Sequence, residues 1–460
     1  MKARFAIPLI FIYLFTLVIK SYSQNGWQTL FDGKTLNNWK QLTGSATYTV
    51  ENGVIVGTTV LSSPNSFLVS DKRITGNFIL ELEAKIEDTT MNSGVQFHSN
   101  YDKNANEGKG KVYGYQFELD ASSRRWSGGV YDEGRRDWLY PVSLNANAQD
   151  AFKLNEFNRI RIEVFGNTVT TWLNGKAVAY FVDTLTKNDG IIALQVHSIG
   201  DHEDRVGEKV YFKNIRIKTA GIQQTPFPKG VYVENLNNNV LTDYEKKNGW
   251  KLLFDGKTSN GWIGAYKKTF PEKGWQIKGG MITVLSSQGK ESANGGDIVT
   301  AEQFSAFDLS FQFKLSPGGN SGVKYFVTLS ENNQGSAIGL EYQVLDDSLH
   351  PDAKLGIAGN RTMASLYDLI KANKQPRFIH GPNEWNTGRI IVYPNNHVEH
   401  YLNGVKVLEY ERGSKEYRDL VAISKYKIWD HFGEAKQGHI LLQDHGDEVS
   451  YRSIKIKVLK

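Results

Sequence analysis

The chain of 460 residues contains no cysteine. It therefore has no disulfide framework and no cysteine for a lipid anchor, so packing alone must stabilise the fold. An excess of charge of one sign is also missing, since 54 Lys and Arg stand against 49 Asp and Glu. So small a surplus gives no reason to expect nucleic acid or an anionic membrane as a partner.

Long apolar runs are scarce, and the clearest one lies at the start of the chain. Residues 5–19 are apolar and follow Lys2 and Arg4. This pattern predicts a cleavable secretory signal over residues 1–23, with Gln24 as the first mature residue. The alternative is a single membrane anchor, for which the run is short. The expected location is the periplasm or the cell exterior, with no membrane span after the signal is removed.

The most informative feature that is present is a repeat. Residues 26–39 return as residues 249–262 at a constant offset of 223 positions. A period this long is too large for a solenoid and indicates two copies of one whole domain. The predicted boundaries are 25–220 for the first copy, 221–247 for a linker, possibly a structured one, and 248–460 for the second copy.

Within each copy the sequence pattern favours strands. Apolar residues alternate with more polar ones over 78–86 and 309–315, as a half-buried antiparallel strand requires. Asn174-Gly175 and Asn403-Gly404 supply the positive φ angles of tight hairpins. Helical patterns are few, and 363–374 is the best helix candidate, if only as a short loop helix. The predicted fold class is all-β, with two tandem antiparallel β-sandwich domains.

Three polar sequence segments of the first copy match three segments of the second copy. The matched pairs are residues 92–98 with 320–326, 114–119 with 339–344, and 194–197 with 442–445. Alternate residues of a strand share a face. In the second copy, one shared face would carry Lys324, Glu341, Gln343, Gln443 and His445. In the first copy, it would carry Gln96, His98, Gln116, Glu118, Gln195 and His197.

These segments resemble the 3-keto-disaccharide hydrolase family, which has a concanavalin A-like lectin/glucanase sandwich. The resemblance covers nearly all of both copies and is closer in the second, through residues 252–256, 320–323, 341–346 and 438–446. The first copy departs from the pattern. Gln116 stands where Glu341 does, Gln96 where Lys324 does, and Val196 where Asp444 does, so Glu118 and His98 are its alternative pair.

The resemblance implies action on glycosides already oxidised at C3. A base removes the C2 proton, the C1 substituent leaves, and water adds to the enone, which amounts to hydrolysis. The implied catalytic residues are Lys324, as the enolate stabiliser, and Glu341 and His445, one as the base and the other as the acid. A non-catalytic lectin on the same scaffold and a lyase that stops at the enone are the alternatives.

The remaining predicted site residues would bind the substrate, an oligosaccharide or other glycoside. They are Gln343, Gln443, Asp346 and Tyr367 in the second copy, and Gln96, His98, Gln116, Glu118, His197 and Tyr131 in the first. The alternative is a purely structural role, in which these side chains form a solvated sheet face or pack long loops.

Cofactors and partners follow from what the sequence does not contain. A divalent cation near Glu341 and His445 would suit the elimination, but the sequence contains no complete set of metal ligands. A dinucleotide-binding fingerprint is also absent, so a separate dehydrogenase is expected to make the 3-keto substrate.

Overall fold

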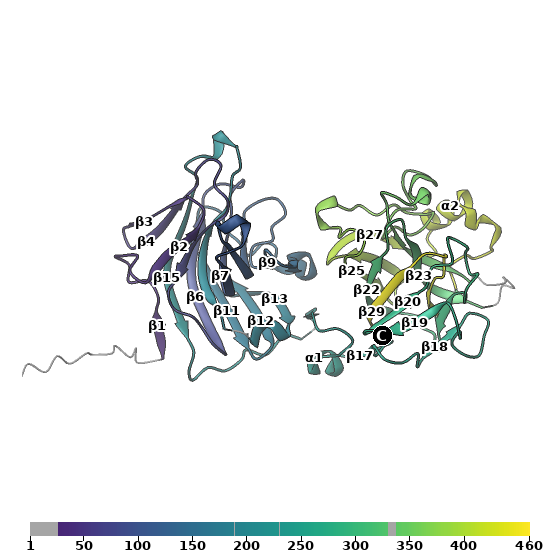
Figure 1. The fold of residues 1–460 in the computed structure, drawn as a ribbon. Coiled ribbons are helices and arrows are strands. Elements are labelled where there is room, and N and C mark those ends of the chain that lie inside the picture. Colours follow the sequence, from purple (N-terminus) through teal and green to yellow (C-terminus); the bar gives the residue numbers. More distant parts are fainter. Residues whose placement is uncertain (1–25, 188, 230, 330–336) are drawn as a thin grey trace, which may run out of the picture.

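The structure is a computed structural model that describes residues 26–187, 189–229, 231–329 and 337–460. The predicted signal peptide, residues 1–23, lies outside the described residues. Figure 1 shows two β-sandwiches side by side, the first purple to blue and the second teal to yellow. The predicted fold class of two tandem antiparallel sandwiches is therefore confirmed.

Two sheets face each other in the first copy. The larger sheet contains, in spatial order, β16 (Glu234–Asn235), β13 (Lys176–Val182), β12 (Thr168–Leu173), β11 (Asn158–Phe165), β6 (Phe78–Ile86), β15 (Lys209–Lys218), β4 (Val54–Thr58) and β3 (Thr47–Glu51), with β1 (Trp27–Thr29) also on β15. The smaller sheet contains β10 (Asp137–Tyr140), β9 (Val130–Glu133), β8 (Lys111–Asp120), β7 (Asn92–Asp102), β14 (Ile191–Val196), β5 (Ser66–Ser70) and β2 (Trp39–Thr43).

The second copy repeats this arrangement. Its larger sheet contains β19 (Trp275–Lys278), β20 (Met281–Val284), β29 (Val449–Val458), β22 (Phe307–Leu315), β25 (Asn386–Val392), β26 (His397–Leu402) and β27 (Val405–Glu411), with β17 (Trp250–Leu252) also on β29. Its smaller sheet contains β18 (Trp262–Gly264), β21 (Ile298–Thr300), β28 (His439–Leu442), β23 (Asn320–Thr328) and β24 (Ile338–Leu345).

Helices are few and short. The α-helices of the described chain are α1 (Asp243–Lys247) and α2 (Lys415–Ile423). The 3-10 helices are η1 (Asn106–Gly108), η2 (Val142–Ala148), η3 (Thr184–Lys187), η4 (Glu203–Arg205), η5 (Pro351–Lys354), η6 (Pro376–Phe378) and η7 (Lys425–Ile428). The helix predicted at 363–374 is wrong: Leu366 bridges to Tyr342 and Ile370, and Ala364 and Asp368 have positive φ. Positive φ at two positions is incompatible with a right-handed helix.

The strand patterns produce the two cores. Phe78, Leu80 and Leu82 of β6 are 0–2% exposed and point between the sheets of the first copy. Leu309 and Phe311 of β22 do the same in the second. Both Asn-Gly turns join adjacent antiparallel strands, β12 to β13 and β26 to β27, and have positive φ at both residues. The alternating residues and the hairpin residues therefore specify these elements as predicted.

Each copy contains the same bulge in its central strand. The register of β7 against β8 shifts after Phe97, and that of β23 against β24 shifts after Tyr325. His98 and Phe326 stand at these shifts with φ of 46° and 54°. A bulge rotates the next side chain to the other face of the sheet, and this feature decides where His98 points.

The segment between the copies is built into the fold. Residues 234–235 form β16, which adds a parallel strand to β13, and α1 begins at a capping box of Thr242 and Glu245. Glu245 also accepts a hydrogen bond from Lys455 of the second copy, Nζ to Oε1 at 2.6 Å, and both side chains are buried. The predicted linker thus contacts both sandwiches.

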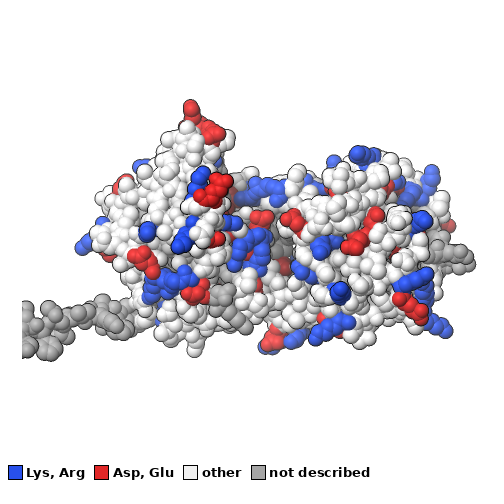
Figure 2. All heavy atoms as spheres, in the orientation of Figure 1, with Lys and Arg blue, Asp and Glu red and all other residues white. Residues whose placement is uncertain are grey.

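Charges of both signs are mixed on the visible face of the molecule. Figure 2 shows Lys and Arg side chains interspersed with Asp and Glu over the visible face. In the part of the chain that the structure describes, no helix has the length and apolar character needed to cross a membrane.

Candidate functional site

The polar segments of the second copy meet on the outer face of its smaller sheet. Lys324 of β23 lies directly opposite Glu341 of β24, and Gly322 lies opposite Gln343. The backbone N–H of Gln443 donates to the Gly322 carbonyl at 3.0 Å, so Gln443 continues the same row. A Cβ at Gly322 would collide with the Glu341 carboxylate, and the glycine thereby makes room for it.

A cavity of about 400 Å³ lies over this row. Lys324, Glu341 and Gln443 line it from the sheet, as the strand pairing predicts. Lys425 and Tyr426 of η7, with Trp429 just after it, line it from a loop. The sheet supplies a cation, a carboxyl and an amide, and the loop adds a second cation and aromatic rings.

Lys324 remains a buried cation because carboxylates surround it. Its side chain is 6% exposed, and its Nζ donates to the Ala337 carbonyl at 3.1 Å. Burial opposes the charge, but Glu341 and Asp297 outweigh it and raise the pKa of Lys324 above its usual value. Burial raises the pKa of Asp297 itself to about 6, against the opposing effect of the Lys324 charge. Lys324 is therefore a preorganised positive charge at the cavity wall.

Lys425 is a second cation that sequence reasoning missed. Its backbone N–H donates to Asp368 at 2.8 Å, and its Nζ lies 4.1 Å from the centre of the Tyr367 ring. Burial lowers the pKa of Lys425, with partial compensation by Glu341. A lysine with a lowered pKa gives up its proton more readily than a surface lysine. The only sequence signal was the Lys- and aromatic-rich character of 425–429, which does not locate it on the cavity.

Three predicted substrate ligands of the second copy do not line this cavity. Gln343 is 1% exposed, and in the orientation that satisfies its amide it donates to Glu341 Oε1 at 3.3 Å. Asp346 accepts hydrogen bonds from Gly318 and Ser348, which caps a turn and lowers its pKa despite burial. The Tyr367 hydroxyl donates to Asp352 at 2.8 Å. Gln343 and Tyr367 support the site through contacts with Glu341, whose carbonyl accepts from the Tyr367 N–H at 3.0 Å, whereas Asp346 stabilises a turn.

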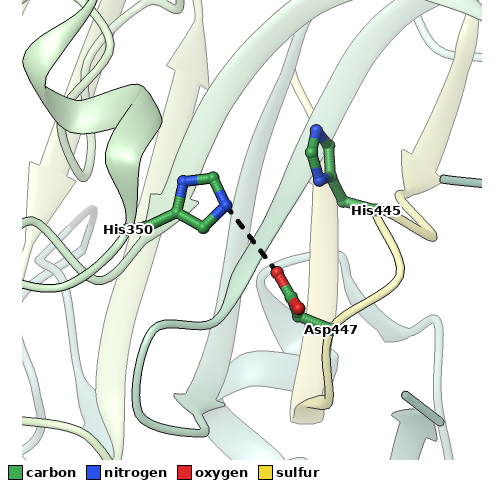
Figure 3. Close-up of side chains that lie close together, drawn as sticks. All are labelled: His350, His445 and Asp447. Carbon is green, nitrogen blue, oxygen red and sulfur yellow. Dashed lines mark ion pairs between the residues drawn. The ribbon is translucent and has the colours of Figure 1, made fainter. Parts of the chain in front are cut away.

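His445 lies at one end of the sheet face, next to two other polar residues. Figure 3 shows His350, His445 and Asp447 together, with the Nε2 of His350 directed at Asp447 across 3.8 Å. The two imidazole rings are 6.0 Å apart between centroids. The sequence missed His350, which comes from the loop before η5, and Asp447, because neither lies in a matched segment.

The spacing of these three residues would suit a metal ion, since one ligand atom from each lies within 4.8 Å of the others. However, the Nδ1 of His350 accepts a hydrogen bond from the Asp352 backbone N–H at 3.2 Å. The neutral ring therefore carries its proton on Nε2, the atom that faces Asp447. Burial and His445 lower the pKa of His350 and favour this neutral form. The Nε2 atom of His350 is therefore better suited to donate a hydrogen bond than to bind a metal ion.

The equivalent face of the first copy carries a larger cavity of about 910 Å³. Gln116, Glu118, Tyr131 and His197 line it, as predicted. Gln96 does not: it is fully buried, donates to Gln116 at 2.7 Å and accepts from Ser99 at 2.5 Å.

His98 faces away from the cavity of the first copy. The bulge turns its ring into the core, 5.0 Å from the Phe78 ring between centroids, and burial lowers its pKa. The predicted pairing of His98 with Glu118 therefore does not form, because strand alternation fails at the bulge.

A third cavity, of about 990 Å³, lies on the larger sheet of the first copy. Part of its charged lining is paired: Arg161 contacts Glu81 at 2.5 Å and Arg216 contacts the same carboxylate at 2.6 Å. Its lining includes none of the matched polar segments. Size alone therefore does not identify the functional site.

Comparison with known proteins shows which family the two copies resemble. Residues 26–218 and 249–457 each match the sequence model of the 3-keto-alpha-glucoside-1,2-lyase-like domain. A Bacteroides thetaiotaomicron protein named 3-keto-disaccharide hydrolase is 40% identical over 232 residues, covering 46% of this chain and 79% of that protein. The two matched ranges coincide with the two sandwiches.

Solved structures were also compared. A candidate glycosyl hydrolase from Parabacteroides distasonis is 29% identical with a TM-score of 0.43, and covers 49% of this chain and 100% of its own. The carbohydrate-binding module CBM66 from Bacillus subtilis is 17% identical with a TM-score of 0.28, and covers 40% of this chain and 96% of its own.

Proposed function

Because the chain belongs to the family of 3-keto-alpha-glucoside-1,2-lyase-like domains, we propose that its second copy cleaves glycosides oxidised at C3. The observation that carries the proposal is the buried Lys324 opposite Glu341 on the wall of one cavity. An elimination next to a ketone needs a base and a positive charge within reach of the same sugar ring.

Glu341 is the proposed base. It takes the C2 proton, and the electrons of that bond move to the C3 oxygen as an enolate. Lys324 holds the enolate oxygen with its ammonium group. Since Glu341 lines the cavity together with Lys324 and His445 does not line it, Glu341 is the better placed of the two bases that the sequence offered.

Lys425 is the proposed acid. When the enolate collapses, the C1–O bond breaks and the departing oxygen takes a proton from the Lys425 ammonium. Lys425 lines the same cavity, and burial lowers its pKa, which makes this transfer easier. Water then adds at C1 and a proton returns to C2, so the net reaction is hydrolysis.

Gln443 and His445 are assigned to substrate binding. The Gln443 side chain is 6% exposed, and its Oε1 has no hydrogen-bond partner among the described residues, so it can accept from a sugar hydroxyl. His445 follows two positions later, beyond the end of β28. With His350 and Asp447 it would contact the part of a disaccharide that extends beyond the cavity.

The test is turnover of a 3-keto-disaccharide in deuterium oxide by the full chain, with mass spectrometry of the products. We expect a free sugar and a 3-keto-sugar carrying deuterium at C2, and Glu341→Gln should abolish both. Cleavage without deuterium at C2 would contradict the elimination. Binding of an unoxidised glycan in this cavity, without any product from the oxidised one, would identify a lectin instead.

A lyase is the second candidate, favoured by the description of the matching family. It would use the same residues and release the enone without adding water. Accumulation of a product 18 mass units lighter than the 3-keto-sugar would identify this outcome.

Two further proposals concern the setting of the enzyme. The apolar run at residues 5–19 supports export to the periplasm or the exterior by a cleaved signal. The 3-keto substrate requires a separate dehydrogenase upstream, since oxidation at C3 needs a hydride acceptor.

A further inference from the structure

The cavity of the first copy is chemically unlike that of the second. At the position of the Lys324–Glu341 pair, β7 and β8 bring Gln96 opposite Gln116. The Gln96 amide donates to Gln116 at 2.7 Å, and the Gln116 amide donates to Glu118 at 2.9 Å. This chain of amides contains no cation to stabilise an enolate, so the site is not equipped for the same elimination.

Four carboxyl groups line the cavity of the first copy, and two of them, Glu118 and Glu133, have a raised pKa. Asn92 donates to Glu118 Oε1 at 2.5 Å, and Asn65 donates to Glu133 Oε1 at 3.3 Å. Burial raises the pKa of Glu118, and it raises the pKa of Glu133 to about 7, with a smaller contribution from Glu118. A carboxyl group that is partly protonated near neutral pH, as Glu133 is, can both donate to and accept from hydroxyl groups.

Aromatic rings form another wall. Trp138 and Tyr131 line the cavity with ring centroids 5.5 Å apart. Arg124 lies over Trp138 at 5.2 Å and is held by Asp120 at 2.6 Å. Rings fixed in this way offer flat apolar faces beside polar groups, which is the combination that the C–H face and hydroxyl groups of a sugar need.

The second copy completes this cavity. Gln375, Arg377 and Phe378, in and next to η6, belong to its lining. The Phe378 ring packs 4.9 Å from Trp126 of the first copy, and Arg377 lies 4.6 Å from the centre of the Phe378 ring. Figure 2 shows Lys and Arg side chains beside the hollow between the two halves. The site therefore exists in full only when both copies are present.

One buried side-chain amide next to this cavity lacks hydrogen-bond partners. Gln195 is fully buried on β14, and neither its Oε1 nor its Nε2 has a hydrogen-bond partner among the described residues. Leu194 pairs with Val95, so Gln195 stands beside Gly94, whose partner on β8 is Glu118. An unpaired amide next to the cavity floor is costly unless water or a ligand satisfies it.

We propose that this composite cavity, formed by the first copy and η6 of the second, is a separate binding site for neutral, unoxidised oligosaccharides. Its volume of about 910 Å³ lies at the upper end of the range for ligand pockets, about 300–1,000 Å³. The site holds the glycan by ring stacking and hydrogen bonds and does not cleave it. It is independent of the reaction proposed for the second copy.

The charges argue for a neutral ligand. Asp120 is already neutralised by Arg124, and Asp137 accepts from the Tyr131 hydroxyl at 2.7 Å. Glu118 and Glu133 would repel a sulfated or phosphorylated sugar when ionised, while Arg377 and Arg124 oppose a cationic one. An uncharged polyhydroxyl ligand is compatible with both the two glutamates and the two arginines.

The experiment is calorimetric titration of the full chain with unoxidised cellotetraose, maltotetraose and trehalose. We expect at least one probe to bind saturably. Trp138→Ala and Arg377→Ala should each weaken that binding by about fivefold or more, the effect expected from loss of one stacked or charged contact. Arg418→Ala serves as the matched arginine control, because Arg418, which lies on α2, pairs with Glu434 and does not line either cavity.

Because Trp138→Ala can unsettle the neighbouring Trp126, Glu118→Gln provides a variant of nearly the same shape. It should weaken binding while leaving the melting temperature within about 2 °C, as expected for a change of less than about 1 kcal/mol. Failure of every probe to bind, or binding that none of the three site variants weakens, overturns the proposal. Turnover of a 3-keto-disaccharide, measured separately, reports on the second copy.

Discussion

In the second copy Lys324 faces Glu341 across β23 and β24, whereas the same register in the first copy brings Gln96 opposite Gln116. The backbone is matched down to the bulge that follows each pair. Two side-chain differences thus replace a charged pair by a pair of amides. Comparison of the copies shows that the sandwich fixes where a site lies and the side chains fix what it can do.

The carboxyl has also moved along the strand. Glu341 occupies the position of Gln116, and Gln343 occupies the position of Glu118, so each strand carries one glutamate and one glutamine in opposite order. The first copy adds Glu133 from β9, beyond the edge of the shared arrangement. Its cavity has more acceptors and no buried lysine at the pairing position, as suits binding rather than proton abstraction.

The loops that close the cavities differ as well. The second copy covers its own cavity with η7, which brings Lys425 and Tyr426 over the sheet. The first copy borrows η6 of the second for the same purpose. In this tandem arrangement a loop of the second copy therefore shapes the cavity of the first.

The largest effect is expected from making the second copy resemble the first at its carboxyl. Glu341→Gln keeps the shape and removes the base, so turnover of a 3-keto-disaccharide should fall by about 10³-fold. The matched change in the first copy, Glu118→Gln, should lower turnover by less than about threefold. Steady-state kinetics of both variants would check this, and equal losses would show that both copies catalyse.

A smaller loss is expected from the other half of the pair. Lys324→Gln removes the charge that holds the enolate and should lower kcat by about 10²-fold, the usual cost of one oxyanion-stabilising group. KM should change little, because the charge develops only in the transition state. Circular dichroism would confirm folding, since the change leaves Glu341 and Asp297 without their cation. A rise in KM at constant kcat would assign Lys324 to substrate binding instead.

Much of this architecture could be predicted from the sequence. The 223-residue offset, the alternation in β6 and β22 and the Asn-Gly turns depend on local geometry, and they specified the copies, the strands and the hairpins. The alternation of side chains along a strand was enough to predict that Lys324, Glu341 and Gln443 share one face of the sheet. These inferences hold because the two-residue period of a strand is rigid between irregularities.

The features that the sequence did not predict lie where strand alternation and residue spacing no longer decide the position of a side chain. Strand alternation put His98 beside Gln96, but the bulge at that residue sends its ring into the core. Lys425, His350 and Arg377 reach the sites from loops whose paths depend on tertiary packing. Nothing in the spacing of these residues along the chain reveals which strand they will cover.

The pH dependence of folding stability should differ between the two copies because of Glu133. No carboxyl group occupies the equivalent position in the second cavity. The folded pKa of Glu133, about 7, lies above the ordinary value of 4.5. Between these values the folded state keeps a proton that the unfolded state has lost, so stability falls as pH rises from about 4.5 to 7. At pH 8, Glu133→Gln should therefore be more stable than the parent by about 3 kcal/mol.

At pH 4 the same comparison should show almost no difference, because Glu133 is then protonated in both states. Urea unfolding of the two proteins at pH 4 and pH 8 measures this directly. A stability difference that does not change with pH would contradict a buried, raised-pKa carboxyl at this position. It would also remove one of the two groups that distinguish the first cavity from the second.

The smallest effect is expected from the His350, His445 and Asp447 group, which lies at the end of the second site. Asp447→Asn should raise KM for a 3-keto-disaccharide by less than about tenfold and leave kcat nearly unchanged, because this group contacts the substrate away from the reacting carbons. His431→Asn, at an exposed histidine of the same copy, is the matched control.

The same kinetics, repeated with and without EDTA, decide between hydrogen bonding and metal binding. Since the Nε2 of His350 carries its proton toward Asp447, the chelator should not change the rates of the parent or the variant. A loss of activity on chelation that manganese or zinc restores, and that Asp447→Asn abolishes, would assign the group to a metal ion. The elimination would then be aided by that cation.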